Sequence, residues 1–464
     1  MGIFYEEVRD RLIRYARINT QSAHFQGFWP TTACQFDLAR LLEKELNEIG
    51  ASDVYLDEAA CIVYAKIPPT PNDEAAAKAR PVGFIAHIDT APDASGENVK
   101  PWVLENYDGS DILLNPEKKI LMKASEFPYL SRYIGQDLIL TDGTTLLGGD
   151  DKASIAAIMT MAAYTCAHPE IPHGPVSIAF TPDEEVGGLA HMLDLERFGA
   201  PVAYTLDGDH LGYYEDETFH ASEARIRIRG RSVHTGTAKG VMVNAADIAS
   251  EFMQMLPPLE KPQYTEGREG FYHVVSCSAA CEGAELYLIV RDFDRNAFEA
   301  REAFLTDCVK RLNGLYGPDT LSIEIEEQYR NMKDVLIDYP ELVADLRQAI
   351  SDAGLTPVCE PFRGGTDGAT LTFRGLPCPN LSAGYENAHG RFEFVPIQSM
   401  EKNVEILLRL CGGHLTSGVK WPQKRPPKPG CPPGGIVTTS GQLTSGDKKR
   451  KNRIVRGQMT SEVK

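Results

Sequence analysis

Residues 151–180 read DKASIAAIMTMAAYTCAHPEIPHGPVSIAF and join a helical pattern to a strand pattern. Apolar side chains recur at helical spacing up to residue 166, and acidic residues stand at the start, where the helix dipole favours them. The segment PVSIAF at 175–180 is a short apolar run typical of a buried strand. A similar run, PVGFIAHI at 81–88, precedes the helix. Strand, helix and strand in this order predict an α/β fold.

Further strands and helices extend this unit outward. Apolar runs at 201–206 and 379–382 predict two more buried strands. Amphipathic patterns predict helices that cover the faces of the sheet, over residues 5–18, 38–46 and 400–410. Residues 1–214 and 329–414 therefore look like two parts of one larger domain.

The pattern changes between residues 222 and 328. The segment EARIRIRG at 223–230 alternates strictly between apolar and basic side chains, as a half-exposed antiparallel strand does. The predicted elements from here on follow the order β-α-β-β-α-β, which is typical of a ferredoxin-like unit. Because apolar strands resume afterwards, we predict a small domain inserted into the larger one, with bounds at 215 and 328.

Charge and composition exclude several classes of protein. The chain of 464 residues has 47 Lys and Arg against 65 Asp and Glu, a net charge of -18 that would repel a phosphate backbone. Nucleic acid is therefore excluded as a main partner. The sequence also contains no run of about 18 consecutive apolar residues, the length that a membrane-spanning helix needs. The N-terminus carries Glu6, Glu7 and Asp10 where a secretory signal needs a basic start and an apolar run, so we expect a cytoplasmic protein.

The last fifty residues have a different composition from the rest. Residues 415–464 hold eleven Lys and Arg but only two acidic residues, and they show no hydrophobic periodicity. Such a segment does not bury enough apolar surface to offset the entropy of ordering, so we predict a basic disordered tail. The run at 448–453 is open to a second interpretation, as a localisation signal or a patch that binds polyanions.

Acidic and imidazole side chains follow several of the predicted strands. His87 and Asp89 end the first strand, Glu184 and Glu185 follow the second within a run of three acids, and Asp207 follows the third. The carboxyl ends of strands in an α/β sheet converge on one crevice. Carboxylates gathered there would repel one another unless a cation compensates them. A metal centre at this edge of the sheet is the simplest explanation.

Each of these motifs taken singly is a weak signal. An isolated His after an apolar strand is often a hydrogen-bonded structural residue, and three acids in a loop are often a solvated surface. His389, shortly after the fourth strand, is an obvious remote imidazole ligand. The segment RGGTDG at 363–368 is interpreted as an anion loop in which Arg363 grips a carboxylate, with a phosphate cradle or a tight turn as alternatives.

Taken together, these segments resemble the peptidase T family of two-zinc tripeptide aminopeptidases, over about residues 4–411. The resemblance rests on ordered blocks that include AHIDTAPD, LLGGDDKA, IAFTPDEEVG, YTLDGD, HTGTAKGVMVNA and RGGTDGA. It implies a catalytic domain with a mixed sheet, an inserted ferredoxin-like lid that also serves dimerisation, and release of the N-terminal residue from tripeptides. It also implies a homodimer that acts on short peptides.

The resemblance further implies a role for each site residue. His87 and Asp207 would bind one zinc ion, Glu185 and His389 the other, and Asp150 would bridge the two, with a cis peptide bond between Asp150 and Asp151. Glu184 would be the general base that takes a proton from water to give a metal-bridging hydroxide, and Asp89 would support the site. His234 would stabilise the oxyanion, in related dimers from the partner subunit, while Asn244 and Arg363 would bind substrate.

Two segments depart from the family pattern. His234-Thr235-Gly236 stands where the family has His-Pro-Gly, and Glu386 and Asn387 fall within the altered segment before His389. These changes leave substrate preference open. Two alternatives remain: another amide hydrolase, such as a dipeptidase, carboxypeptidase or N-acyl amino acid deacylase, and a binding protein that has kept the scaffold.

Overall fold

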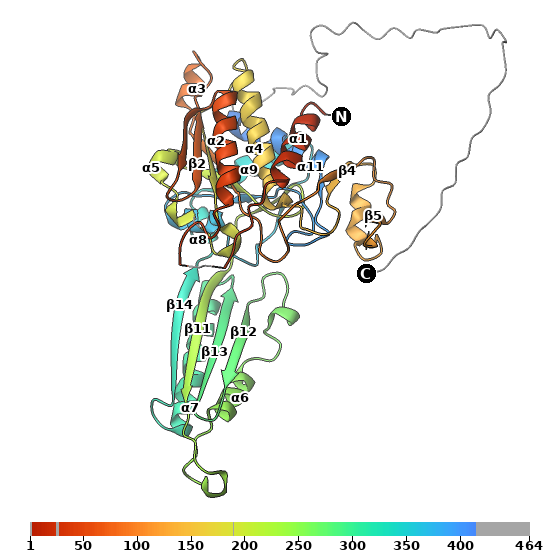
Figure 1. The fold of residues 1–464 in the computed structure, drawn as a ribbon. Coiled ribbons are helices and arrows are strands. Elements are labelled where there is room, and N and C mark those ends of the chain that lie inside the picture. The colour runs from red at the N-terminus through yellow and green to blue at the C-terminus, as the bar shows by residue number, and fades with distance from the viewer. Residues whose placement is uncertain (1, 25–26, 189, 414–464) are drawn as a thin grey trace, which may run out of the picture. The chain divides into compact units, whose positions relative to one another are not determined.

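The computed structural model describes residues 2–24, 27–188 and 190–413 (Figure 1). Its largest sheet has eight strands in the order β1-β2-β8-β3-β9-β16-β10-β15. Parallel pairing joins β8, β3, β9 and β16 at the centre, and antiparallel pairs stand on either side. The bounds are β1 Ser52–Asp57, β2 Ile62–Ile67, β8 Val176–Thr181, β3 Val82–His87, β9 Ala203–Leu206, β16 Asn380–Leu381, β10 Tyr213–Glu215 and β15 Val358–Cys359. The predicted α/β class with a mixed sheet is confirmed.

The register of the central strands brings their carboxyl ends to one edge. His87 at the end of β3 pairs with Thr181 at the end of β8, and Ile85 pairs with Thr205 in β9. Asp207 directly follows β9, and its N–H donates to the carbonyl of Leu381 in β16 at 2.9 Å. The segments that follow β3, β8 and β9 therefore start next to one another.

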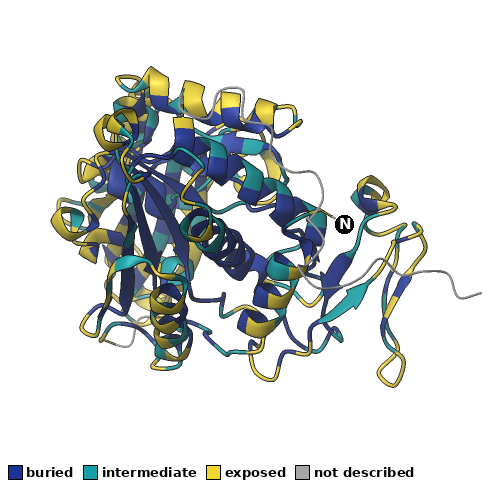
Figure 2. Cartoon of the chain, turned by 90° about the horizontal axis from the view of Figure 1, so that it is seen from above, coloured by how far each residue is buried: buried dark blue, intermediate teal, exposed yellow. Residues whose placement is uncertain are grey.

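The central strands are apolar because both of their faces are buried. In β3, Phe84 and Ala86 pack into one hydrophobic core, whereas Ile85 packs into another on the opposite face. Continuous burial of this kind is typical of a sheet covered on both sides. Figure 2 shows the strands buried and the covering helices exposed only on their outer faces. The α-helices outside residues 215–328 in the described part of the chain are α1 Tyr5–Ala16, α2 Gln35–Ile49, α3 Glu74–Lys78, α4 Gly149–Ala167, α5 Leu195–Phe198, α8 Lys333–Leu336, α9 Pro340–Asp352, α10 Asp367–Phe373 and α11 Ile397–Gly412.

Helix α4 is the buried helix that the sequence predicts between the first two strands. It packs against β3, α1, α2 and α11, and every residue from Gly149 to Ala162 is buried, which explains its apolar composition on all sides. Its first turn is irregular, because Asp150 and Asp151 have non-helical backbone angles and the peptide bond between them is cis. The acidic pair therefore stands at the buried start of the helix.

A second sheet is formed by residues of the predicted insertion. Its four strands have the order β12-β13-β11-β14, and it has a hydrophobic core of its own. Arg225, Arg227 and Arg229 of β11 are exposed while the apolar residues between them are buried, as the alternation predicts. The elements follow the predicted β-α-β-β-α-β order: β11 His220–Arg229, α6 Ala245–Met255, β12 Phe271–Ala279, β13 Gly283–Asp292, α7 Arg295–Tyr316 and β14 Leu321–Tyr329.

Smaller elements complete the described part of the chain. A three-stranded sheet joins β17 Val395–Pro396, β7 Leu138–Leu140 and β4 Trp102–Leu104, and a hairpin joins β5 Ile112–Asn115 to β6 Ile120–Met122. Among the described residues, no helix has the length and apolarity required to cross a membrane. The predicted basic tail at 415–464 lies outside the described residues.

Candidate metal centre

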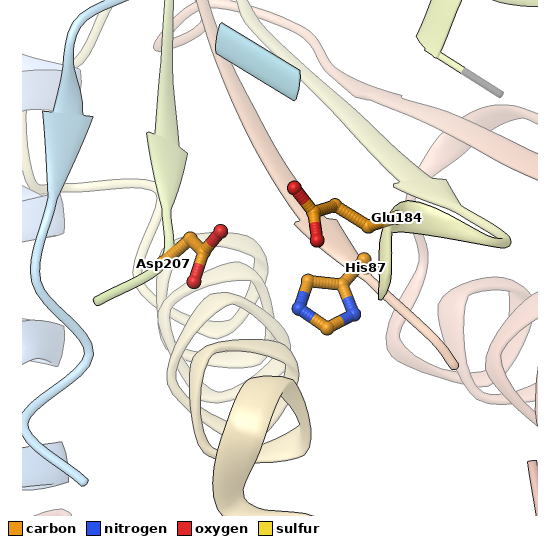
Figure 3. Close-up of side chains that lie close together, drawn as sticks. All are labelled: His87, Glu184 and Asp207. Carbon is orange, nitrogen blue, oxygen red and sulfur yellow. The ribbon is translucent and has the colours of Figure 1, made fainter. Parts of the chain in front are cut away.

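Three of the predicted site residues meet where the central strands end (Figure 3). His87 ends β3, Glu184 lies in the turn after β8, and Asp207 follows β9. One potential ligand atom from each lies within 4.8 Å of those of the other two. The register of the strands thus brings residues that are far apart in the sequence to one edge of the sheet.

Asp150 connects this group to the remaining predicted ligands. Its Oδ1 lies 3.0 Å from Nε2 of His87, and its Oδ2 lies 3.1 Å from Nε2 of His389. The same Nε2 of His389 lies 2.9 Å from Oε2 of Glu185. The two oxygens of one carboxylate therefore face two different imidazoles. The structure brings together all five residues for which the resemblance implies a role as metal ligands.

Asp89 supports the turn that carries Glu184 and Glu185. Its side chain is fully buried and accepts hydrogen bonds from the backbone N–H groups of Glu184 at 3.0 Å and Glu185 at 3.3 Å. Its Oδ1 also lies 3.3 Å from Nδ1 of His87. One carboxylate thus fixes both the imidazole and the acidic turn. A neighbouring acceptor of this kind orients a ligating histidine.

The third acid of the run points elsewhere. Asp183 is buried and accepts hydrogen bonds from the N–H of Thr31 at 2.8 Å and from Nε2 of Gln35 at 2.7 Å. Its backbone is left-handed, with φ at 58°, and a short 3-10 turn starts at the next residue. This turn lets consecutive carboxylates point in different directions. Asp183 anchors the turn and is not one of the gathered ligands.

The charges of the cluster are strongly perturbed. Burial and the nearby Asp150 raise the pKa of Glu185 to about 7, and burial with Asp207 raises the pKa of Glu184 well above its ordinary value. Burial would also raise the pKa of Asp150, but the two imidazoles hold that pKa below its usual range. Hydrogen bonds to Asp150 and Glu185 raise the pKa of His389 to about 11. The arrangement therefore needs positive charge, which protonated imidazoles or bound cations can supply.

The altered segment before His389 makes contacts that were not predicted. Tyr385 is buried, and its hydroxyl donates to Oδ1 of Asp207 at 2.9 Å. Glu386 is also buried, with Nδ1 of His210 at 2.9 Å and the hydroxyl of Tyr133 as a second partner. Glu386 is thus held within the protein rather than turned toward a ligand.

The other predicted site residues lie outside this cluster. His234 is exposed, and its Nδ1 accepts from the N–H of Gly236 at 3.2 Å. Asn244 caps α6 by accepting from the N–H of Ala246 at 3.2 Å. Arg363 donates to the carbonyls of Gly267 and Glu269, at 2.7 and 2.9 Å. None of these three has a contact with the five clustered ligands among the described contacts.

Comparison with known proteins identifies the family. A model of the peptidase family M20/M25/M40 matches residues 147–412. The chain is 46% identical over 405 residues to a peptidase T from Geobacillus thermodenitrificans, covering 87% of this chain and 97% of the relative. The chain belongs to the M20/M25/M40 peptidase family. A peptidase T from Caldanaerobacter subterraneus subsp. tengcongensis is also 46% identical, over 87% of this chain and 98% of that one. The predicted peptidase T-type metallo-aminopeptidase is confirmed at the level of the family.

Solved structures share the fold of this M20 peptidase. The aminopeptidase PepT from Bacillus cereus superposes with a TM-score of 0.69 at 21% identity and covers 88% of this chain and 98% of that one. YXEP from Bacillus subtilis, described as a dinuclear metal binding peptidase of the M20 family, superposes with a TM-score of 0.60 at 13% identity over the same shares.

Sequence reasoning missed two residues of this M20 peptidase that contact the cluster. One is Tyr385, whose position four residues before His389 was the only available signal. The other is Glu393, a buried acid whose carboxylate accepts from the N–H of Asp150 at 2.9 Å. In the segment RFEFV at 391–395 this acid alternates with aromatic residues, a pattern that favours an exposed strand position.

Proposed function

We propose that the chain is a two-zinc aminopeptidase that releases the N-terminal residue of tripeptides. The observation that carries the proposal is Asp150, whose two oxygens each face a different imidazole. A bridging carboxylate between two cation sites needs this arrangement. The peptidase T relatives, at 46% identity over most of the chain, support the substrate class.

The residues present fit a pair of divalent cations. His87 and Asp207 would hold one ion, and Glu185 and His389 would hold the other. Asp150 would bind both ions. Oε1 of Glu185 is buried and has no hydrogen-bond partner, which leaves an acceptor free for a cation. Mixed imidazole and carboxylate ligands suit zinc, although ligands of this kind also bind other divalent metals.

The cations, Glu184 and Asp89 would each have a separate role in hydrolysis. When bound, the two ions would polarise the scissile carbonyl and lower the pKa of the attacking water. Glu184 would take a proton from that water and return it to the departing amine. The carboxylate of Glu184 lies within the group that contains His87 and Asp207, which gives it access to the reacting atoms. Asp89 would hold the turn of Glu184 in place through two backbone hydrogen bonds.

Substrate recognition would use the other predicted residues. We propose that residues 215–328 form an inserted lid and dimerisation domain, between catalytic parts at 1–214 and 329–414. His234 would stabilise the oxyanion from the partner subunit, and Asn244 and Arg363 would bind the peptide. Arg363 would have to exchange its carbonyl contacts with Gly267 and Glu269 for the substrate carboxylate. A cytoplasmic location stays a prediction.

A substrate panel tests the proposed function. The zinc-loaded protein is assayed with a tripeptide, the matching dipeptide, the N-acetylated tripeptide and an N-acyl amino acid, and products are separated by chromatography. We expect release of the first residue from the free tripeptide at least about tenfold faster than cleavage of the others, a difference of about 1.4 kcal/mol in transition-state binding. Preference for the acyl amino acid or the dipeptide would favour the alternative hydrolases. Zinc binding without turnover would favour a binding protein.

Mixing two impaired variants tests the role of His234. Alone, His234→Ala and Glu184→Gln should each be at least about 100-fold slower than the wild type, the first without its oxyanion donor and the second without its base. If the partner subunit supplies His234, a mixed dimer contains one site that has both native residues. We expect activity to return when the two variants are unfolded together and refolded, as measured by tripeptide hydrolysis. Activity of His234→Ala equal to that of the wild type would contradict the assignment.

A further inference from the structure

Glu393 is a buried acid with an unusual set of partners. Glu393 is only 2% exposed, and both of its carboxylate oxygens accept hydrogen bonds from backbone N–H groups. Oε2 accepts from the N–H groups of Leu147 at 2.7 Å and Gly148 at 2.8 Å, while Oε1 accepts from the N–H of Asp150 at 2.9 Å. Glu393 therefore binds the chain on which the bridging carboxylate stands, and both oxygens are already engaged.

The carboxylate of Glu393 lies at the start of helix α4. Leu147 and Gly148 directly precede the helix, and Asp150 is in its first turn. The first N–H groups of a helix have no partner within the helix, and an anion at that end is favoured. The backbone leaves room for this carboxylate because residue 149 is glycine. A Cβ at Gly149 would lie 3.1 Å from Oε1 of Glu393 and 2.4 Å from Cγ2 of Val395. Close packing thus joins the Glu393 segment to the irregular first turn that carries Asp150.

The loop that ends at Glu393 also carries His389. Reciprocal hydrogen bonds between Glu386 and Phe394, at 2.9 and 3.0 Å, close this loop, and the N–H of Glu393 donates to Gly390 at 3.2 Å. His389 has a positive φ of 61°, a conformation that residues other than glycine seldom adopt. A closed loop can hold such a backbone in place. One short loop thus presents an imidazole to one oxygen of Asp150 and fixes the backbone of the same residue.

We propose that Glu393 is a positioning residue that sets the Asp150 carboxylate against His389, and so determines how tightly the pair of cations binds. The inference rests on the proposed two-cation site and adds a residue to it. Glu393 is not itself a ligand in this proposal. It acts through the N–H of Asp150 and through the loop that it shares with His389.

The Glu393→Gln variant tests the proposal. Its amide keeps the size of the side chain, but its NH₂ group must face one of the N–H donors, so at least one of the three hydrogen bonds is lost. Zinc affinity and stoichiometry are measured on the full chain by competition with a chelator. We expect the affinity of the variant to fall about 10–100-fold, the range found when partners that orient metal ligands are removed. Urea unfolding of the metal-free proteins gives the structural cost separately.

Glu45→Gln is the matched control. Glu45 is also a buried carboxylate with several donors, because it accepts from Arg11 at 2.6 Å and from Tyr15 at 2.6 Å and pairs with Arg14 at 2.7 Å. It has no contact with the five ligands among the described contacts. We expect Glu45→Gln to lower stability toward urea and to leave zinc affinity within about twofold of the wild type, well short of the Glu393→Gln loss.

The outcomes separate the inference from the function on which it rests. If the wild type binds two ions and Glu393→Gln binds them equally tightly while losing stability, Glu393 is only structural and the inference is overturned. If the wild type itself binds no metal, the proposed function fails first. Should Glu393→Gln not fold, Glu393→Asp carries the same measurement, because it keeps the charge but draws the carboxylate back by one methylene group. Weakened zinc binding by Glu393→Asp supports the inference, and unchanged binding overturns it.

Discussion

Glu184→Gln is expected to bind zinc as the wild type does and to hydrolyse a tripeptide about 10²–10⁴-fold more slowly, the usual contribution of a general base. The amide keeps the shape of the side chain but takes up no proton from water at neutral pH. Burial and the neighbouring Asp207 raise the pKa of Glu184, which makes its carboxylate a stronger base than that of an exposed glutamate. The variant should lower kcat rather than raise KM.

The measurement needs both metal content and rate. Zinc per chain is measured after dialysis, and kcat is measured at saturating tripeptide. Glu196→Gln, at an exposed position beyond the same turn, serves as control and should keep full activity. A Glu184→Gln protein that holds its zinc and works at the wild-type rate would exclude Glu184 as the base.

Asp150→Asn is expected to lose both cations together. Each oxygen of Asp150 faces one imidazole, so a neutral amide removes an anionic ligand from both sites at once. We expect zinc affinity to fall by more than about 100-fold, beyond the effect of removing a partner that only orients a ligand. Tripeptide hydrolysis should fall with it and should return only at very high zinc concentration.

A variant at a distant buried acid controls for general damage. Asp292→Asn breaks the ion pair between the buried Asp292 of β13 and the partly buried Arg301 of α7, at 2.7 Å. It should lower the free energy of unfolding and leave zinc binding unchanged. If Asp150→Asn loses only one of two ions, Asp150 does not bridge, and the assignment of the pair would have to change.

The central part of the fold could be predicted from the sequence, because its apolar patterns correspond to the faces that are buried in the structure. The run at 81–88 is apolar throughout since β3 is covered on both faces, and α4 is apolar on all sides for the same reason. Parallel strands end at one edge, so the grouping of His87, Glu184 and Asp207 followed from their places after three strands.

Other features depended on contacts between distant segments. The sequence does not show that β2 runs antiparallel to β8, or that Asp183 turns away to Thr31 and Gln35. His389 was identified from its place shortly after the fourth predicted strand, but only the resemblance paired it with Glu185 on one metal. Glu393 was missed because its hydrogen-bond donors are backbone N–H groups. Almost every residue has such a group, so no residue type in the sequence indicates the contact. The roles of His234, Asn244 and Arg363 stay predictions.

The placement of the ligands along the chain has a consequence for biosynthesis. His87, Asp150, Glu185 and Asp207 all precede the second sheet, whereas His389 follows it. A nascent polypeptide that has left the ribosome as far as β14 therefore lacks one imidazole and the loop that holds it. The complete centre can therefore form only once the loop that carries His389 has also emerged, after every strand of the second sheet.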